Sequence, residues 1–99
     1  MSKHLLVVED SVPIAKVIES IGRSLGYQVT IASTLSEVRA ILAKKHDFFV
    51  ATIDYGLPDA NDGEAISFVL QHKIPSIVMT GRVDDQTRKK ILNLPVIDY

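Results

Sequence analysis

The sequence of 99 residues contains no cysteine, no long apolar run and almost no net charge. Without cysteine, disulfides, zinc–thiolate sites and thiol catalysis are all excluded. Eleven basic residues against twelve acidic ones give a formal net charge of −1, so there is no electrostatic reason to expect direct nucleic-acid binding. No apolar run approaches the roughly 18–20 residues of a membrane span, and none near the start is long enough for a signal peptide. We therefore expect a cytoplasmic protein without membrane contact.

The composition that remains is typical of one small folded domain. Hydrophobic residues make up 46% of the chain and charged residues 23%, which is too apolar for an intrinsically disordered segment. A chain of this length can hold one core and one domain at most. Because the sequence contains no repeat and no Gly/Ser/Pro-rich linker, we expect residues 1–99 to form a single domain.

Short apolar runs alternate with apolar residues at helical spacing. Leu5–Val8 is a continuous apolar run of the kind found in strands that are buried on both faces. Apolar residues over 14–25 then recur at helical spacing, with Ser11 as the expected N-cap and Gly26 as the expected stop. Residues 27–31 alternate between apolar and polar, which predicts a second strand.

This alternation continues through the rest of the chain. It predicts helices over residues 35–42, 65–70 and 84–91 and strands over residues 48–53, 74–79 and 96–99. Thr34 and Glu37 have the spacing of a capping box at the start of the first of these helices. Alternating strands and helices, with strands too apolar for burial on one side only, favour a doubly wound α/β fold with a parallel sheet covered on both faces.

Carboxylates follow two of the predicted strands. Glu9 and Asp10 come directly after the first strand and Asp54 after the third. Right-handed crossovers bring the carboxyl ends of parallel strands to one edge of the sheet, where such folds bind ligands. At ~4 Å and an effective dielectric constant near 20, each pair of like charges would cost about 4 kcal/mol. Either one carboxylate is protonated or a cation binds, and oxygen-only ligands select a hard ion such as Mg²⁺.

A carboxylate beside Mg²⁺ can also act as a nucleophile. It can accept a phosphoryl group as an acyl phosphate, while the metal neutralises the charge on the transferred group. Thr80 follows the predicted fourth strand, and its hydroxyl could donate a hydrogen bond to a phosphoryl oxygen. Gly81 next to it would leave room for the group to approach.

Four short motifs lie in order and at matching spacing along the whole chain. They are Val7–Ser11, Asp54 followed by Leu57-Pro58, Val78–Gly81, and Asp98-Tyr99. Together they resemble the response-regulator receiver domain of two-component signal transduction. The resemblance implies a flavodoxin-like fold with strand order 2-1-3-4-5. It also implies a phosphorylation-dependent signalling switch rather than an enzyme, with a histidine kinase or histidine phosphotransfer protein as phosphodonor and an effector domain or partner protein as output.

The resemblance assigns roles to individual residues. Asp54 matches the phosphoacceptor, and Asp10 matches the carboxylate that binds Mg²⁺ directly. Glu9 matches the acid that acts through a metal-bound water, and Gly56 the position whose backbone carbonyl completes the protein ligands. The two switch positions match Thr80, whose hydroxyl moves onto the phosphoryl group, and Tyr99, whose ring turns inward when it does.

The sequence departs from the family pattern in two places. Residues 59–63 contain one residue more than usual before the Asp-Gly pair, from which we expect a changed loop shape and unchanged chemistry. The family's lysine and final helix lie beyond the position of Tyr99, so we expect a receiver domain that is incomplete at its C-terminus, a fragment of a longer regulator. A second chain or domain could cover the exposed face of the sheet, and a homodimer is one such arrangement.

Two other functions remain open at this stage. A degenerate receiver would act as a protein-interaction domain without phosphorylation, which the absent lysine favours and the four matching site residues oppose. An aspartate-nucleophile phosphatase on a similar sheet usually needs an acid two residues after its nucleophile. Gly56 occupies that position, which argues against the phosphatase.

Overall fold

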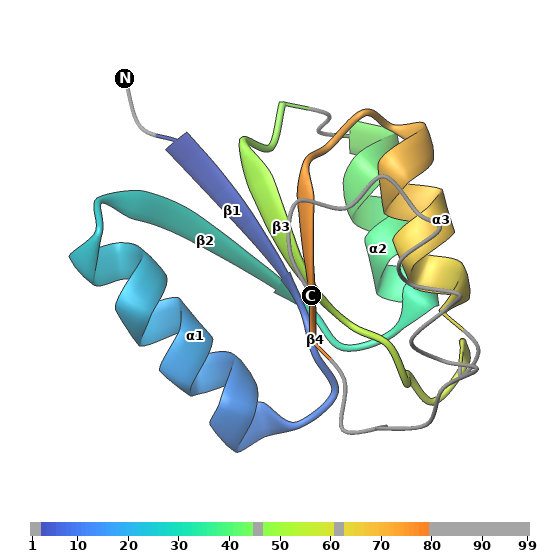
Figure 1. The fold of residues 1–99 in the computed structure, drawn as a ribbon, viewed down its shortest axis with the longest axis horizontal. Coiled ribbons are helices and arrows are strands. Elements are labelled where there is room, and N and C mark those ends of the chain that lie inside the picture. The colour runs from blue at the N-terminus through green and yellow to red at the C-terminus, as the bar shows by residue number, and fades with distance from the viewer. Residues whose placement is uncertain (1–2, 45–46, 61–62, 80–99) are drawn as a thin grey trace.

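Strands and helices alternate along the chain in the computed structural model, which describes residues 3–44, 47–60 and 63–79 (Figure 1). Within these residues the elements are β1 (Lys3–Val8), α1 (Val12–Ser24), β2 (Tyr27–Ala32), α2 (Leu35–Lys44), β3 (Val50–Asp54), α3 (Glu64–Gln71) and β4 (Ser76–Met79). The helix predicted over 84–91 and the strand predicted over 96–99 lie outside the described residues. No helix in the described part is long and apolar enough to span a membrane.

The four strands form one parallel sheet in the order β2-β1-β3-β4. This arrangement confirms the predicted α/β fold and the first four positions of the predicted strand order. The chain crosses over from β1 to β2, which lies on one side of β1, and β3 lies on the other side of β1. The order therefore reverses between β1 and β3, and in such sheets this switch point opens a crevice outside the carboxyl ends of the strands.

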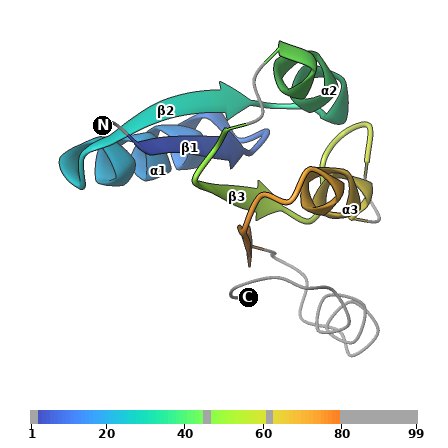
Figure 2. The ribbon, with the colours of Figure 1, turned by 90° about the horizontal axis from the view of Figure 1, so that it is seen from above.

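Helices cover both faces of the sheet, as a doubly wound fold requires. Helix α1 lies on one face and α2 and α3 on the other (Figure 1), and Figure 2 shows α2 and α3 next to each other on the same side. Side chains alternate between the faces along each strand. Leu5 and Val7 of β1 therefore pack with Ala15 of α1, while Leu6 and Val8 join the larger core under α2 and α3.

The start and stop of α1 agree only partly with their prediction. Gly26 ends the helix with a φ of 92°, a conformation that glycine adopts without strain. Ser11 occupies the N-cap position, as predicted, but its side chain makes no capping hydrogen bond. A capping hydroxyl accepts from the second or third N–H of the helix. The second helical residue is Pro13, which has no N–H to donate.

Candidate functional site

Three carboxyl groups meet at the switch point between β1 and β3. Val8 and Ile53 are register partners, so the residues that follow them, Glu9 and Asp54, lie side by side at the carboxyl edge. Asp10 comes next in the chain. One carboxylate oxygen from each of the three acids lies within 4.8 Å of the other two. The structure thus brings together the acids that the sequence placed at the ends of two different strands.

Glu9 is the most buried of the three acids. Only 5% of the residue is exposed, and one carboxylate oxygen accepts a hydrogen bond from the Ser11 N–H at 3.1 Å. Burial raises the pKa of Glu9 to about 7, against the lowering effect of the Ser11 N–H and with a further rise from the charge of Asp54. Burial therefore favours the protonated form of Glu9 more than it would be favoured in an exposed glutamate.

Asp54 is the last residue of β3 and is half-buried. Burial raises its pKa, although the Gly56 N–H donates to its Oδ1 at 3.3 Å and lowers it. The hydrogen bond fixes one carboxylate oxygen and orients the group at the strand end. A side chain added at Gly56 would meet no atom within 4 Å. Gly56 therefore contributes to the site through its backbone, which any residue can supply.

The donor set of this cluster fits a hard divalent cation. All its ligand atoms are carboxylate oxygens, which is the chemistry that Mg²⁺ prefers. Three like charges this close, in a partly buried position, repel one another unless a proton or a cation compensates them. The pKa values of Glu9 and Asp54 are raised first by burial and further by the neighbouring carboxylates.

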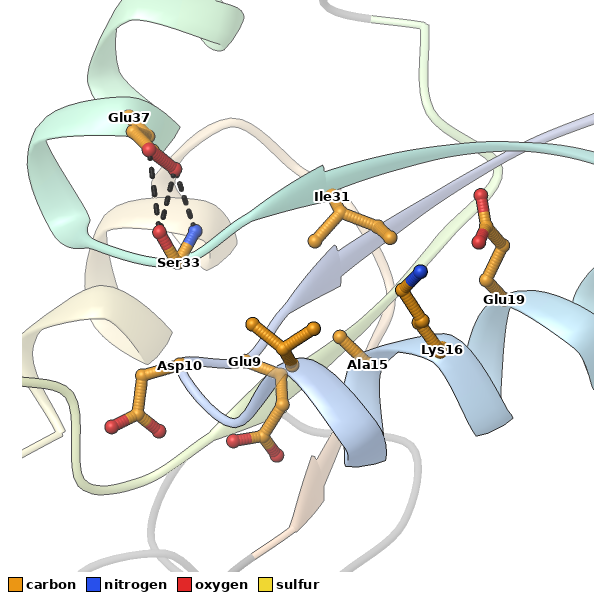
Figure 3. Close-up of a pocket in the computed structure, with 9 residues that line it drawn as sticks. Glu9, Asp10, Ala15, Lys16, Glu19, Ile31, Ser33 and Glu37 are labelled. Atoms are coloured by element: carbon orange, nitrogen blue, oxygen red, sulfur yellow. Dashed lines mark hydrogen bonds between the residues drawn. The ribbon is translucent and has the colours of Figure 1, made fainter.

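A cavity of about 230 Å³ adjoins the cluster on the side of α1 and β2 (Figure 3). Ala15 and Ile31 give it apolar walls, and Ser33 and Glu37 border it. The carboxyl groups of Glu9 and Asp10 point away from the hydrogen-bonded pair of Ser33 and Glu37 (Figure 3).

The two predicted switch residues, Thr80 and Tyr99, lie outside the described residues. The described part of the chain ends at Met79, which is the register partner of Asp54 across β3 and β4. The carbonyl of Met79 also accepts the N–H of Tyr55 at 2.9 Å. Thr80, the next residue in the sequence, thus follows a backbone position that is paired with Asp54.

The role of one residue in the loop after Asp54 does not follow from the sequence. Asp59 lies at the start of the segment with one extra residue, and its carboxylate accepts hydrogen bonds from two backbone N–H groups at the start of α2. The sequence offers only a general reason to expect such a contact, because the first N–H groups of any helix need hydrogen-bond acceptors. Nothing in the local sequence joins positions 24 residues apart.

Comparison with known proteins gives the chain its family. Residues 5–99 match the family model of the response regulator receiver domain. No curated protein sequence matches the chain. The chain belongs to the response regulator receiver domain family.

Solved structures show the same fold. A CheY-like receiver domain protein from Methanospirillum hungatei JF-1 is 28% identical with a TM-score of 0.88, covering all of this chain and 80% of that one. A two-component response regulator with a GGDEF domain is 30% identical with a TM-score of 0.82, covering 99% of this chain and 40% of that one. A receiver protein from Pseudomonas putida, at 19% identity and a TM-score of 0.89, covers all of this chain and 84% of that one and shows the fold alone.

Family membership confirms the flavodoxin-like fold and the general class of function. Receiver domains are phosphorylation-dependent switches of two-component signalling and not classical enzymes. They bind Mg²⁺ at an acidic pocket, and this chain has an acidic cluster at the corresponding edge of the sheet.

Proposed function

We propose that this chain accepts a phosphoryl group on Asp54 from a histidine kinase or a histidine phosphotransfer protein. The observation that carries the proposal is the convergence of Glu9, Asp10 and Asp54 at the switch point of a receiver-domain sheet. Asp10 would bind Mg²⁺ directly, Glu9 would act through a metal-bound water, and Asp54 would contribute one carboxylate oxygen. The backbone carbonyl of Gly56 would complete the protein ligands.

The transfer needs an ionised Asp54 in a fixed orientation. The Gly56 N–H holds Oδ1 of Asp54, which leaves Oδ2 as the attacking atom. Oδ2 forms a bond to phosphorus while the bond from phosphorus to the donor's imidazole nitrogen breaks, and the electron pair leaves with that nitrogen. When bound, Mg²⁺ supplies charge neutralisation for the transferred phosphoryl group and favours the ionised carboxylates.

The signal would leave the site through Thr80 and Tyr99. In this proposal the Thr80 hydroxyl donates to a phosphoryl oxygen and the ring of Tyr99 turns inward, which changes the face seen by an effector domain or partner protein. The match of the family across residues 5–99 supports both assignments. The similar response regulator with a GGDEF domain supports an output domain as the receiver of the signal. We also propose that the chain acts in the cytoplasm without binding nucleic acid directly.

Mg²⁺ titration tests the metal site on which this transfer depends. We expect weak binding of one ion per chain, because most of its ligands would be water. Asp10→Ala should abolish binding and Glu9→Ala should weaken it. Glu19→Ala is the matched control, since Glu19 lies on α1 and forms an ion pair with Arg23 at 3.1 Å. Wild-type affinity in Asp10→Ala would contradict the proposed site.

A further inference from the structure

The start of α2 is capped from two different parts of the chain. Locally, the Thr34 hydroxyl accepts the N–H of Glu37 at 3.1 Å, and the Glu37 carboxylate accepts the N–H of Ser33 at 2.8 Å. From 24 and 23 residues further along, the two carboxylate oxygens of Asp59 accept the N–H groups of Leu35 at 2.8 Å and Ser36 at 3.1 Å. The predicted capping box is therefore only partly formed: Thr34 accepts the N–H of Glu37, but Glu37 accepts the N–H of Ser33 instead of that of Thr34.

The contact between Asp59 and α2 is favourable on electrostatic grounds. A carboxylate at a helix N-terminus meets the positive end of the helix dipole and unpaired N–H donors. The hydrogen bond from the Leu35 N–H lowers the pKa of Asp59, so the side chain stays ionised near neutral pH. The contact joins two segments that are far apart in the sequence, the loop after β3 and the start of α2.

The loop that carries Asp59 begins at Asp54. At one end, the Gly56 N–H donates to the Asp54 carboxylate. In the middle, Leu57 and Ala60 exchange two backbone hydrogen bonds at 3.2 Å, and both side chains are buried in the core. Asp59 lies inside this closed turn. The segment Tyr55–Ala60 is thus attached to the phosphoacceptor position at one end and to α2 at the other.

We propose that Asp59 is a positioning residue for the site: its contact with α2 holds the segment Tyr55–Ala60 and thereby fixes Gly56 relative to Asp54. The part of this inference that concerns Mg²⁺ binding rests on the proposed function. The part that concerns the position of the loop does not depend on it. Linkage adds a reciprocal effect. If the Asp59 contact strengthens Mg²⁺ binding, Mg²⁺ binding strengthens the contact by the same factor.

Two alanine variants separate positioning from simple helix capping. Asp59→Ala removes the cap that comes from the loop, and Thr34→Ala removes the local cap and leaves the loop untouched. Both should lower the stability of α2 by a similar amount. Without metal, amide hydrogen exchange at Gly56, Leu57 and Ala60 should be faster by about five- to tenfold in Asp59→Ala. In Thr34→Ala, exchange at these amides should be as slow as in the wild type, once the rates are corrected for any difference in global stability between the two proteins.

Mg²⁺ titration of the same variants supplies the second measurement. Asp59→Ala should weaken binding by about tenfold, as loss of a group that orients a ligand does. Thr34→Ala should bind like the wild type, and Asp59→Asn, which keeps an acceptor oxygen, should lie between. In the wild type, Mg²⁺ should slow exchange at the Leu35 and Ser36 amides, and in Asp59→Ala it should not.

The outcomes distinguish the inference from the proposed function. Equal loop exchange in Asp59→Ala and Thr34→Ala would overturn the inference, and so would wild-type Mg²⁺ affinity in Asp59→Ala. A wild-type chain that binds no Mg²⁺ would contradict the proposed function instead. In that case the exchange measurement alone still decides whether Asp59 holds the loop.

Discussion

The two faces of the sheet are packed in different ways. Under α2 and α3, large side chains such as Leu42, Ile53 and Ile66 are completely buried in one continuous cluster. Under α1, the buried cluster within the described residues consists of Leu5, Val7 and Ala15, with partly buried neighbours. The helix and its C-cap residue leave a stripe of apolar side chains exposed: Ile14 at 47%, Val17 at 60%, Ile21 at 55% and Leu25 at 71%.

Small residues explain how α1 still packs on the sheet. The buried residues of the helix are Ala15 and Gly22, seven positions apart on one side. A side chain at Gly22 would come within 2.8 Å of the Leu5 side chain and 3.2 Å of the Val29 side chain. Helix α1 therefore lies close to the sheet through Ala15 and Gly22, with Ile18 partly buried on the same side, while its other large apolar residues stay exposed. The periodicity of a helix does not by itself reveal which side faces the sheet.

The largest expected effect concerns a glycine on the densely packed face. Gly63, at the start of α3, has a φ of 81°, and an added Cβ would lie 2.7 Å from the Tyr55 ring. Gly63→Ala should lower the free energy of unfolding by about 3 kcal/mol, from backbone strain and overpacking together. Urea denaturation measures this loss.

Gly26, which follows α1, is the matched control for Gly63. Its φ is 92°, but no atom lies within 4 Å of an added Cβ. Gly26→Ala should therefore lower the free energy of unfolding through backbone strain alone, by about 1 kcal/mol. Equal losses at Gly26 and Gly63 would show that crowding against Tyr55 contributes nothing.

A matched pair of valines tests the comparison of the faces directly. Val69 of α3 is fully buried, whereas Val17 of α1 is 60% exposed. Val69→Ala should cost about 2 kcal/mol, because it leaves a cavity in the core. Val17→Ala should change the stability by less than about 0.5 kcal/mol. Denaturation curves that place Val17→Ala close to Val69→Ala would mean that the α1 stripe is covered in solution, for example in a dimer.

A smaller effect than those at Gly63 and Val69 concerns the approach of α1 to the sheet. Gly22→Ala improves helix propensity by about 1 kcal/mol but forces the new methyl group against Leu5, at about 1–3 kcal/mol. We expect a net loss of about 1 kcal/mol in thermal or urea unfolding. The exposed Ser20→Ala, two residues away on the same helix, should not destabilise the chain. A Gly22→Ala variant more stable than the wild type would argue against close packing at this point.

Most of the site could be predicted because it depends on strand ends. Carboxyl ends of parallel strands share one edge, so Glu9, Asp10 and Asp54 had to meet once their strands were recognised. The contact between Asp59 and α2 could not be predicted, because it joins positions 24 residues apart and no local sequence pattern links them. Hydrophobic spacing located α1 but not its buried side, which is decided by how closely Ala15 and Gly22 allow the helix to approach.

Phosphorylation of Asp54 is the central claim, and intact-protein mass spectrometry tests it most directly. The chain is incubated with a small phosphodonor, with and without Mg²⁺, beside Asp54→Asn and the control Glu19→Gln. We expect one labile phosphoryl group on the wild type and on Glu19→Gln only when Mg²⁺ is present, and none on Asp54→Asn. Labelling of Asp54→Asn to the same stoichiometry, or no labelling of the wild type with Mg²⁺, would contradict the account.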